Sequence, residues 1–317
     1  MQDEKIAIII PMYNVANHIQ DVIAEIPEPV DIIIAVDDQS KDHTVQLVKE
    51  ISDPRLQLVQ HEQNQGVGGA MKSGFQRAME LGVTICIKID GDGQMPIEYL
   101  QELITPILKG KADFTKGNRF SDLESILNMP GIRRFGNLGL SFLTKAASGY
   151  WNTFDPTNGF FAIDVSTLKK INLADLHSRY FFESSLLCAL YQHRAVIEEV
   201  AMPARYGNEK SSLSEFKALF EFPLLLFAKL MRRIWLRYFV MDFSIASISL
   251  FTGFLLTLFG AIWGIYWWYH SYLTGVPSTT GTVIIATIPI ILGFQLILQF
   301  ITLDIQNVPT KPNNPRK

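Results

Sequence analysis

Two aspartates follow an apolar segment at residues 83–89, and a glutamine comes two positions later. In an extended chain residues i and i+2 point to the same side, so Asp90, Asp92 and Gln94 can converge on one point. Carboxylate and amide oxygens are ligands that Mg²⁺ or Mn²⁺ accepts, and such an ion would neutralise the charge of a departing diphosphate. The spacing therefore predicts a divalent-metal site, with a solvated turn as the alternative.

Polar residues also follow two earlier apolar segments, at residues 6–10 and 31–36. A carboxylate after a strand can accept hydrogen bonds from a nucleobase N–H or a ribose hydroxyl, or it can cap the helix that follows. The candidate nucleotide-binding residues at these two places are Pro11, Tyr13, Asn14 and Asp38.

A glycine-rich segment, NQGVGGAMKS, spans residues 64–73. A phosphate-binding P-loop requires glycine directly before the lysine, and the dinucleotide fingerprint requires glycine at the same position, which is Met71 here. An ATPase and a dehydrogenase are therefore disfavoured. The segment instead predicts a tight helix start beside a nucleotide, with Asn64 as a contact and Lys72 either near phosphate or solvated.

Short β-branched segments alternate with helical ones through the first third of the chain, which predicts parallel βαβ units with ligands at the carboxyl ends of the strands. The expected strands are residues 6–10, 31–36, 56–60 and 83–89, and the expected helices are residues 15–26, 44–51 and 67–81.

The chain changes character near its C-terminal end. Of its 317 residues, 19% are charged, yet residues 243–303 contain no Asp, Glu, Lys or Arg. Residues 243–268 and 282–303 are each long enough to cross about 30 Å of hydrocarbon, which predicts two transmembrane helices. The net charge of −3 gives no basic surface of the kind that nucleic acid requires.

Basic residues flank this segment on both sides, whereas the loop between the spans has none. The positive-inside rule therefore predicts that both termini and the catalytic domain lie in the cytoplasm. Lys229, Arg233 and Arg237 recur at helical spacing and predict an in-plane amphipathic helix against anionic lipid, or a helix packed on the first domain. Gly260 and Gly264 could admit either the second span or a neighbouring subunit of a homo-oligomer.

Two cysteines, Cys86 and Cys188, lie in apolar segments and are expected to be packed thiols in a reducing compartment. The first residues are too polar and the following apolar segment too short for a signal peptide. Residues 307–317 are rich in Pro, Asn and Lys, which predicts a disordered tail.

Together these motifs resemble family 2 glycosyltransferases with the GT-A fold, in the polyprenyl-phosphate glycosyltransferase branch that includes dolichyl-phosphate mannose synthases and bacterial undecaprenyl-phosphate glucosyltransferases. The resemblance rests on PMYN at residues 11–14, DDQS at 37–40, Asn64 with Gly66, and DGDGQ at 90–94. It implies that Pro11, Tyr13 and Asp38 contact the nucleoside. It also implies that Asp90 contacts the ribose and metal, and that Asp92 and Gln94 bind the metal.

Later segments resemble the same branch. By this resemblance Arg119, Arg133 and Arg134 would meet the acceptor phosphate, for which the guanidinium fork is suited. Asp155 would line the acceptor side, and Arg205 with Lys210 would lie over the diphosphate. The Gln-x-x-Arg-Trp element of polymerising members is absent, so processive synthesis is not expected.

The expected activity is inverting transfer of a hexose from a UDP- or GDP-linked sugar to a polyprenyl phosphate at the cytoplasmic face of a membrane. Alternatives are transfer to the hydroxyl of a diacylglycerol-type lipid, which would need a base such as Asp155, and a non-catalytic nucleotide-sugar-binding scaffold. The expected organisation is a GT-A α/β domain at residues 1–210, juxtamembrane helices at 211–242, two transmembrane helices at 243–304 and a cytoplasmic tail at 305–317.

Overall fold

A computed structural model describes residues 4–119, 131–156, 158–203 and 215–315. The chain forms two compact units. The sheet unit comprises residues 1–230 and 309–317, and the hairpin unit comprises residues 231–308. The chain thus leaves the sheet unit and returns to it.

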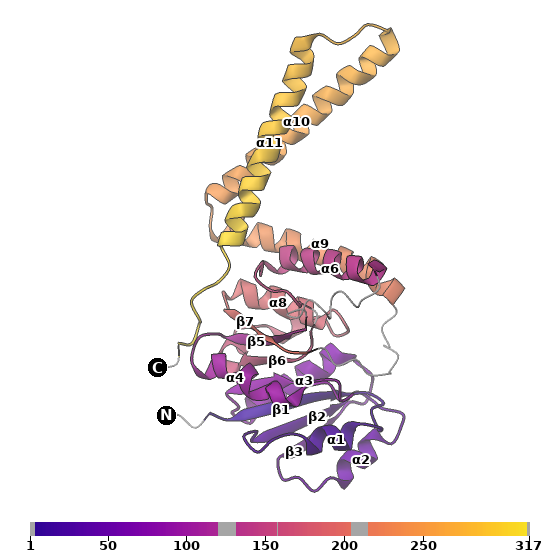
Figure 1. Ribbon diagram of the computed structural model, residues 1–317, viewed down its shortest axis with the longest axis vertical. Coiled ribbons are helices and arrows are strands. Elements are labelled where there is room, and N and C mark those ends of the chain that lie inside the picture. The colour runs from indigo at the N-terminus through magenta and orange to yellow at the C-terminus, as the bar shows by residue number, and fades with distance from the viewer. Residues whose placement is uncertain (1–3, 120–130, 157, 204–214, 316–317) are drawn as a thin grey trace. The chain divides into compact units, whose positions relative to one another are not determined.

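The described part of the sheet unit is built on a mixed seven-stranded sheet with the order β3-β2-β1-β4-β6-β5-β7 (Figure 1). Its strands are β1 (Ile6–Met12), β2 (Ile32–Asp37), β3 (Leu56–Gln60), β4 (Ile85–Lys88), β5 (Phe114–Asn118), β6 (Phe161–Asp164) and β7 (Ile197–Ala201). The first four strands are parallel, as the sequence predicts, and β1, β2 and β4 are buried along their whole length. Strand β6 departs from the parallel pattern because it runs antiparallel to both β4 and β5.

The antiparallel strand brings a later segment of the chain to the site edge of the sheet. Phe161 at the start of β6 is paired with Lys88 at the end of β4. Residues 158–160, which precede β6, therefore approach the two residues that follow β4.

Helices cover the sheet and bury its β-branched side chains. In sequence order they are α1 (Ile19–Ala24), α2 (Thr44–Glu50), α3 (Val67–Glu80), α4 (Leu100–Leu108), α6 (Gly131–Ser148), α7 (Val165–Leu168), α8 (Phe182–Gln192) and α9 (Glu215–Trp235), with 3₁₀ turns at Ile97–Tyr99 and Leu173–Asp175. One core joins isoleucines of β1, β2 and β4 to α1 and α4, and a smaller cluster joins Ala147 of α6, Phe181 and Leu226 of α9. Cys86 and Cys188 are buried free thiols, as expected.

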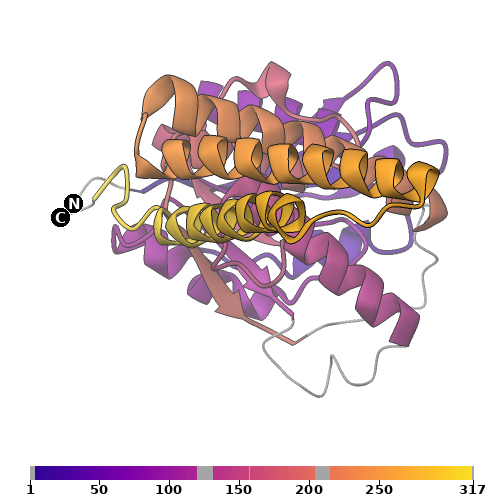
Figure 2. The same ribbon diagram turned by 90° about the horizontal axis from the view of Figure 1, so that it is seen from above.

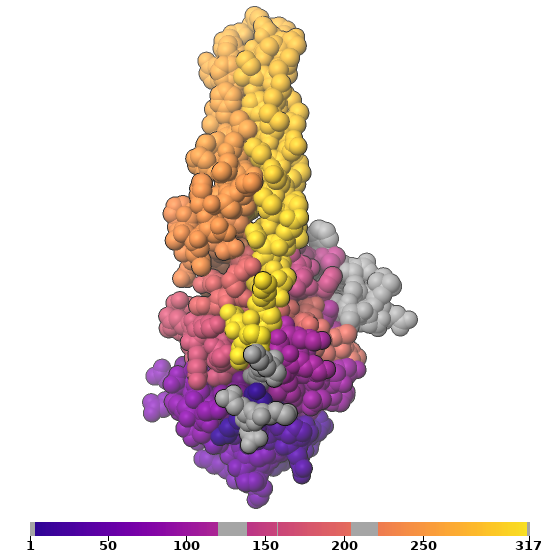
Figure 3. Space-filling view, turned by 90° about the vertical axis from the view of Figure 1, so that its left-hand side faces the viewer, coloured from indigo at the N-terminus to yellow at the C-terminus, as the bar shows by residue number. Residues whose placement is uncertain are grey.

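The C-terminal tail, predicted to be disordered, instead docks on the sheet unit. The backbone N–H of Asn313 donates to both carboxylate oxygens of Asp113, at 2.8 and 3.0 Å, and the Asn314 side chain donates to Asp164. Asp113 is buried, so these bonds satisfy acceptors that water cannot reach. The tail is yellow in Figure 3, where it lies along the surface of this unit.

The hairpin unit consists of a π-helical turn (Leu236–Met241) and two long helices, α10 (Ile245–Thr274) and α11 (Thr280–Gln306), which run side by side (Figure 2). Both helices are long and apolar enough to cross a membrane. They are joined at Gly275, whose φ of 69° is a left-handed conformation that glycine adopts readily. A Cβ on Gly260 would lie 2.6 Å from the Ala286 carbonyl oxygen, so this glycine lets the second span approach.

A buried ion pair joins the two ends of the hairpin unit. Arg233 donates to both oxygens of Asp304, at 2.7 and 2.8 Å, and the Tyr238 hydroxyl donates to the same carboxylate at 2.6 Å. Arg233 is only 3% exposed. Its predicted place on a lipid-facing basic stripe is therefore wrong, because its charge is matched by an acid 71 residues later in the chain.

Candidate active site

The polar residues that follow the first strands meet at one edge of the sheet, as predicted. Met12 of β1 is paired with Asp37 of β2, and Ile9 of β1 with Lys88 of β4. Asp38, the residue after Asp37, donates its backbone N–H to the Met12 carbonyl at 2.9 Å. The carboxyl ends of three neighbouring strands thus carry the candidate site.

Asp90 and Asp92 lie in a turn directly beyond β4. The Asp90 side chain is 34% exposed, and Asp92 accepts a hydrogen bond from the Gln94 backbone N–H at 3.1 Å. Gly93 has φ of 72°, which allows the chain to turn back at this point. The dyad is therefore accessible and locally fixed.

Lys88, which was not among the predicted site residues, lies next to this turn and contacts Asp90. Its ammonium is 2.7 Å from Asp90 Oδ1 and 3.2 Å from Glu183 Oε1, and its side chain is 2% exposed. Burial acts to lower the pKa of Lys88, but the two carboxylates raise it above its ordinary value. The lysine therefore stays charged between two acids.

Asp38, predicted to contact a nucleoside, binds His61 and the backbone at residues 65 and 66, which lie in the segment between β3 and α3. Its Oδ1 lies 2.8 Å from His61 Nδ1 and accepts the Gln65 N–H at 2.8 Å, and its Oδ2 accepts the Gly66 N–H at 2.7 Å. His61 Nε2 lies 2.8 Å from Ser73 Oγ. Asp38 and His61 thus join the end of β2 to the start of α3, and a contact of Asp38 with the nucleoside stays a prediction.

The glycine-rich segment packs against the chain before α8. A Cβ on Gly68 would collide with the His177 carbonyl, and the Gly69 N–H donates to the Ser178 carbonyl at 2.9 Å. Lys72 donates to Ser178 Oγ at 3.0 Å, and burial lowers the pKa of Lys72. The glycines thus permit a close approach of two backbone segments just before α8, the helix whose Glu183 contacts Lys88.

Tyr13 and Asn14 extend the edge beyond β1. Tyr13 is 45% exposed, whereas Pro11 is buried in the strand. Asn14 has φ of 55° and accepts the Lys41 N–H at 2.8 Å, and the Asn64 side chain donates to the Asp38 carbonyl at 3.0 Å. Of these residues, Tyr13 has an exposed aromatic ring, while the two asparagines fix loops.

A second charged cluster surrounds Asp155. This fully buried carboxylate accepts hydrogen bonds from Arg119 Nε at 2.7 Å and Nη2 at 3.1 Å. Burial acts to raise the pKa of Asp155, but the hydrogen bonds and charge of Arg119 lower it below its ordinary value. The two predicted acceptor-side residues are therefore an ion pair.

Lys116 and Glu199 complete this second cluster and were not predicted. Burial lowers the pKa of Lys116 to about 8, against the effect of the Asp155 and Glu199 carboxylates. Burial raises the pKa of Glu199, which accepts hydrogen bonds from the Phe154 and Asp155 N–H groups. A lysine at the end of the apolar strand β4 needs a buried acid, and this signal points to Lys88, whereas Lys116 lies in a strand that also contains Thr115 and Asn118.

Four predicted residues lie where the structure gives no side-chain position. Arg133 and Arg134 belong to the first turn of α6, but their side chains lie outside the described part of the chain. Arg205 and Lys210 lie outside the described residues altogether.

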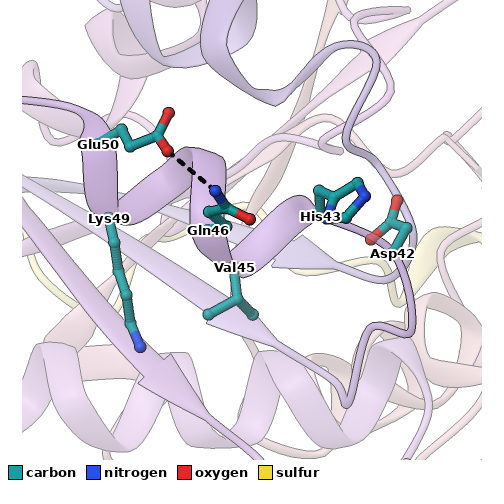
Figure 4. Close-up of a pocket in the computed structure, with 6 residues that line it drawn as sticks. All are labelled: Asp42, His43, Val45, Gln46, Lys49 and Glu50. Atoms are coloured by element: carbon teal, nitrogen blue, oxygen red, sulfur yellow. Dashed lines mark hydrogen bonds between the residues drawn. The ribbon is translucent and has the colours of Figure 1, made fainter.

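A separate surface pocket over α2 is lined by Asp42, His43, Val45, Gln46, Lys49 and Glu50 (Figure 4). None of these six belongs to the two charged clusters.

Comparison with known proteins gives both the class and the family to which this fold belongs. The family model described as "Glycosyl transferase family 2" matches residues 7–171. The chain belongs to glycosyl transferase family 2.

Curated relatives include a UDP-N-acetylglucosamine–dolichyl-phosphate N-acetylglucosaminyltransferase of Methanococcus voltae, which is 34% identical over 221 residues, or 65% of this chain and 88% of the relative. A polyprenol monophosphomannose synthase of Mycolicibacterium smegmatis is 28% identical over 58% of this chain and 71% of the relative. Among solved structures, glucosyl-3-phosphoglycerate synthase from Mycobacterium tuberculosis with Mn²⁺ and UDP has a TM-score of 0.51 at 18% identity, over 73% of this chain and 80% of that one. This likeness shows a shared GT-A fold.

Proposed function

We propose that this chain is an inverting glycosyltransferase that moves a hexose from a UDP- or GDP-linked sugar to a polyprenyl phosphate at the cytoplasmic face of a membrane. The observation that carries the proposal is the accessible Asp90–Asp92 turn at the carboxyl end of β4, in a chain that also has two candidate membrane spans. Relatives named for transfer to dolichyl phosphate and polyprenol support the lipid acceptor.

The chemistry of the turn fits a divalent cation. Mg²⁺ and Mn²⁺ are commonly held by one or two carboxylates together with substrate phosphates, and the described residues offer two adjacent acids rather than a closed cage. Asp90, Asp92 and Gln94 would hold the ion. When bound, it would neutralise the charge of the departing nucleoside diphosphate.

The remaining donor contacts follow from position. Tyr13 offers an exposed ring for stacking on the base. Pro11, Asn14, Asp38 and Asn64 are proposed as further nucleotide contacts at the same edge of the sheet. Lys72, Arg205 and Lys210 are proposed to act near the diphosphate. Lys72 would have to leave Ser178 to do so.

A phosphate acceptor needs no general base, because a phosphate monoester with a second pKa of about 6 is already ionised at neutral pH. One of its oxygens, held by Arg133 or Arg134, would attack the anomeric carbon as the bond to the nucleoside diphosphate breaks. Asp155 would act by fixing Arg119, which is 35% exposed, for the same phosphate.

The state of Asp155 weighs against a diacylglycerol hydroxyl as acceptor. A general base must reach the proton that it removes, yet Asp155 is fully buried, paired with Arg119 and of lowered pKa. The alternative of a non-catalytic scaffold is not favoured either, because the Asp90 turn keeps accessible acids of the kind that a catalytic metal ion needs.

The proposed orientation rests on connectivity as well as on flanking charge. Two spans return the chain to the side from which it started, and the tail beyond the second span docks on the sheet unit. Both flanks therefore belong on one side of the membrane, and the basic flanks place that side in the cytoplasm.

Replacing Asp92 tests the donor site. Asp92→Asn should lower sugar transfer from nucleotide sugar to polyprenyl phosphate by about 100-fold or more, because a metal ligand contributes several kcal/mol to charge stabilisation. Exposed Asp175, in a 3₁₀ turn remote in sequence, provides the matched control Asp175→Asn, which should transfer normally. Wild-type rates in the Asp92 variant would contradict the proposed site.

A further inference from the structure

A buried lysine, Lys88, links Asp90 in the turn after β4 to Glu183 in the first turn of α8. Lys88 is the last residue of β4, in the middle of the sheet, and its side chain is 2% exposed. Charged side chains are almost never buried to this degree unless they are paired. Its two partners, Asp90 and Glu183, therefore account for its presence there.

The three charges come from different elements. Asp90 lies in the turn after β4, and Glu183 lies in the first turn of α8, which the glycine-rich segment holds in place through Ser178. The ammonium, 2.7 Å from one carboxylate and 3.2 Å from the other, is the link between them.

The surrounding chain leaves room for this ammonium and little more. A Cβ on Gly159 would collide with Lys88 Nζ and would lie 3.2 Å from Asp90 Oδ2. Gly159 belongs to the segment that the antiparallel strand β6 brings to this edge. A methyl group at this position would displace the ammonium while leaving all three charged residues in the chain.

Loss of the ammonium would leave two carboxylates close together in a largely buried place. Like charges at this distance repel each other, so the two carboxylates would move apart. Asp90 is the more accessible of the two acids, with 34% of its side chain exposed against 16% for Glu183, and is therefore the one with room to move.

We propose that Lys88 is a positioning residue that holds the Asp90 carboxylate in place for the donor nucleotide and couples it to Glu183. This inference rests on the proposed function of the Asp90 turn. It gives Glu183 a part in donor binding through Lys88.

The test is calorimetric titration of the full-length protein in detergent with Mn²⁺ and whichever of UDP and GDP the wild-type protein binds. Lys88→Met, which keeps the length of the side chain and removes its charge, should weaken binding about tenfold, a coupling typical of contacting charged residues. Adding Glu183→Gln to Lys88→Met should restore most of the affinity, because the uncompensated neighbouring charge is removed. Gly159→Ala should weaken binding, and Gly139→Ala, where a Cβ meets no atom within 4 Å, should not.

Thermal unfolding without ligand identifies folded variants, and Gly159→Ala tests the same contact if Lys88→Met fails to fold. Wild-type affinity in Lys88→Met, or in Gly159→Ala if the first is unfolded, would overturn the inference. A double variant no tighter than Lys88→Met would likewise overturn the coupling to Glu183. Failure of the wild-type protein to bind either nucleotide with Mn²⁺ would contradict the proposed function itself, which separates the two failures.

Discussion

At the scale of single residues, the site is organised by ion pairs whose members are buried to different degrees. The Asp155 carboxylate is fully buried and the Arg119 guanidinium is partly exposed, so removing the arginine leaves a charge that water cannot solvate. Asp90, by contrast, keeps an exposed face although Lys88 neutralises it from below. We therefore expect the first pair to contribute to stability as well as to the proposed acceptor site, and the second pair to contribute to the proposed donor site.

Arg119→Met should destabilise the protein at pH 7 by about 3 kcal/mol, as expected when one partner of a buried ion pair is removed. The pKa of Asp155 is lowered in the folded protein. Its contribution is therefore complete above the ordinary value of about 3.9 and is lost as the pH falls through the lowered one. In the variant, burial would instead raise the pKa of Asp155, so the cost should shrink as the pH falls from 7 towards 4.

Thermal unfolding in detergent across this pH range measures the effect. Arg77→Met is the control, because Arg77 pairs with Glu80 on the surface and exposed pairs contribute at most about 1 kcal/mol. An equal loss of stability in the two variants at pH 7 would contradict the account of Asp155.

At the scale of elements, the hairpin unit is fastened at its base by Arg233, Tyr238 and Asp304. The two oxygens of Asp304 receive three hydrogen bonds from these partners, which come from the end of α9 and the turn that follows it. Close packing at Gly253, Gly260 and Gly293 then carries the contact along the two helices. The ion pair thus fixes which face of α11 contacts the end of α9 and the π-helical turn at Leu236–Met241.

Arg233→Met should destabilise the hairpin unit by about 3–5 kcal/mol, because it leaves Asp304 buried and charged without its guanidinium. The exposed neighbour Arg232 offers the control Arg232→Met, which should change little. Thermal unfolding and limited proteolysis near residues 236–244 would measure the difference. Similar protection of both variants would show that the ion pair does not hold the base together.

Local sequence pattern predicted the elements well. β-branched segments gave the first four strands to within two residues at most ends, and the absence of charge from residues 243–303 located both long helices. These features depend on near neighbours in the chain. The parallel direction of the first strands and the meeting of their carboxyl ends followed from the βαβ pattern, whereas the order of the strands was not predicted.

Contacts between distant residues were not predictable in the same way. Asp304 is 71 residues from Arg233, and the hydrogen bonds from the Asp38 carboxylate to the backbone at residues 65 and 66 were likewise not predicted. The tail has a disordered composition, yet Asn313 meets a buried acid 200 residues earlier. Lys88 was the one visible clue, since a lysine in an apolar strand requires a partner that sequence spacing does not name.

At the scale of the whole molecule, the chain leaves the sheet unit near residue 230 and returns to it at residue 309. A polyprenyl phosphate is confined to a bilayer, so an enzyme that uses it gains from candidate spans continuous with its catalytic domain. The segments of the chain before and after the hairpin unit, which holds those candidate spans, both belong to the sheet unit. The family, the fold and the candidate spans are therefore consistent with the same kind of acceptor.

The most direct test of this account offers two lipid acceptors in one reaction. Purified full-length protein in detergent would be supplied with labelled UDP- and GDP-sugars, Mn²⁺, polyprenyl phosphate and diacylglycerol. The lipid products would be separated and identified by mass spectrometry. We expect label in a polyprenyl-phosphate sugar and none in diacylglycerol. Label in a glycosyl diacylglycerol, or free sugar with no lipid product, would contradict it.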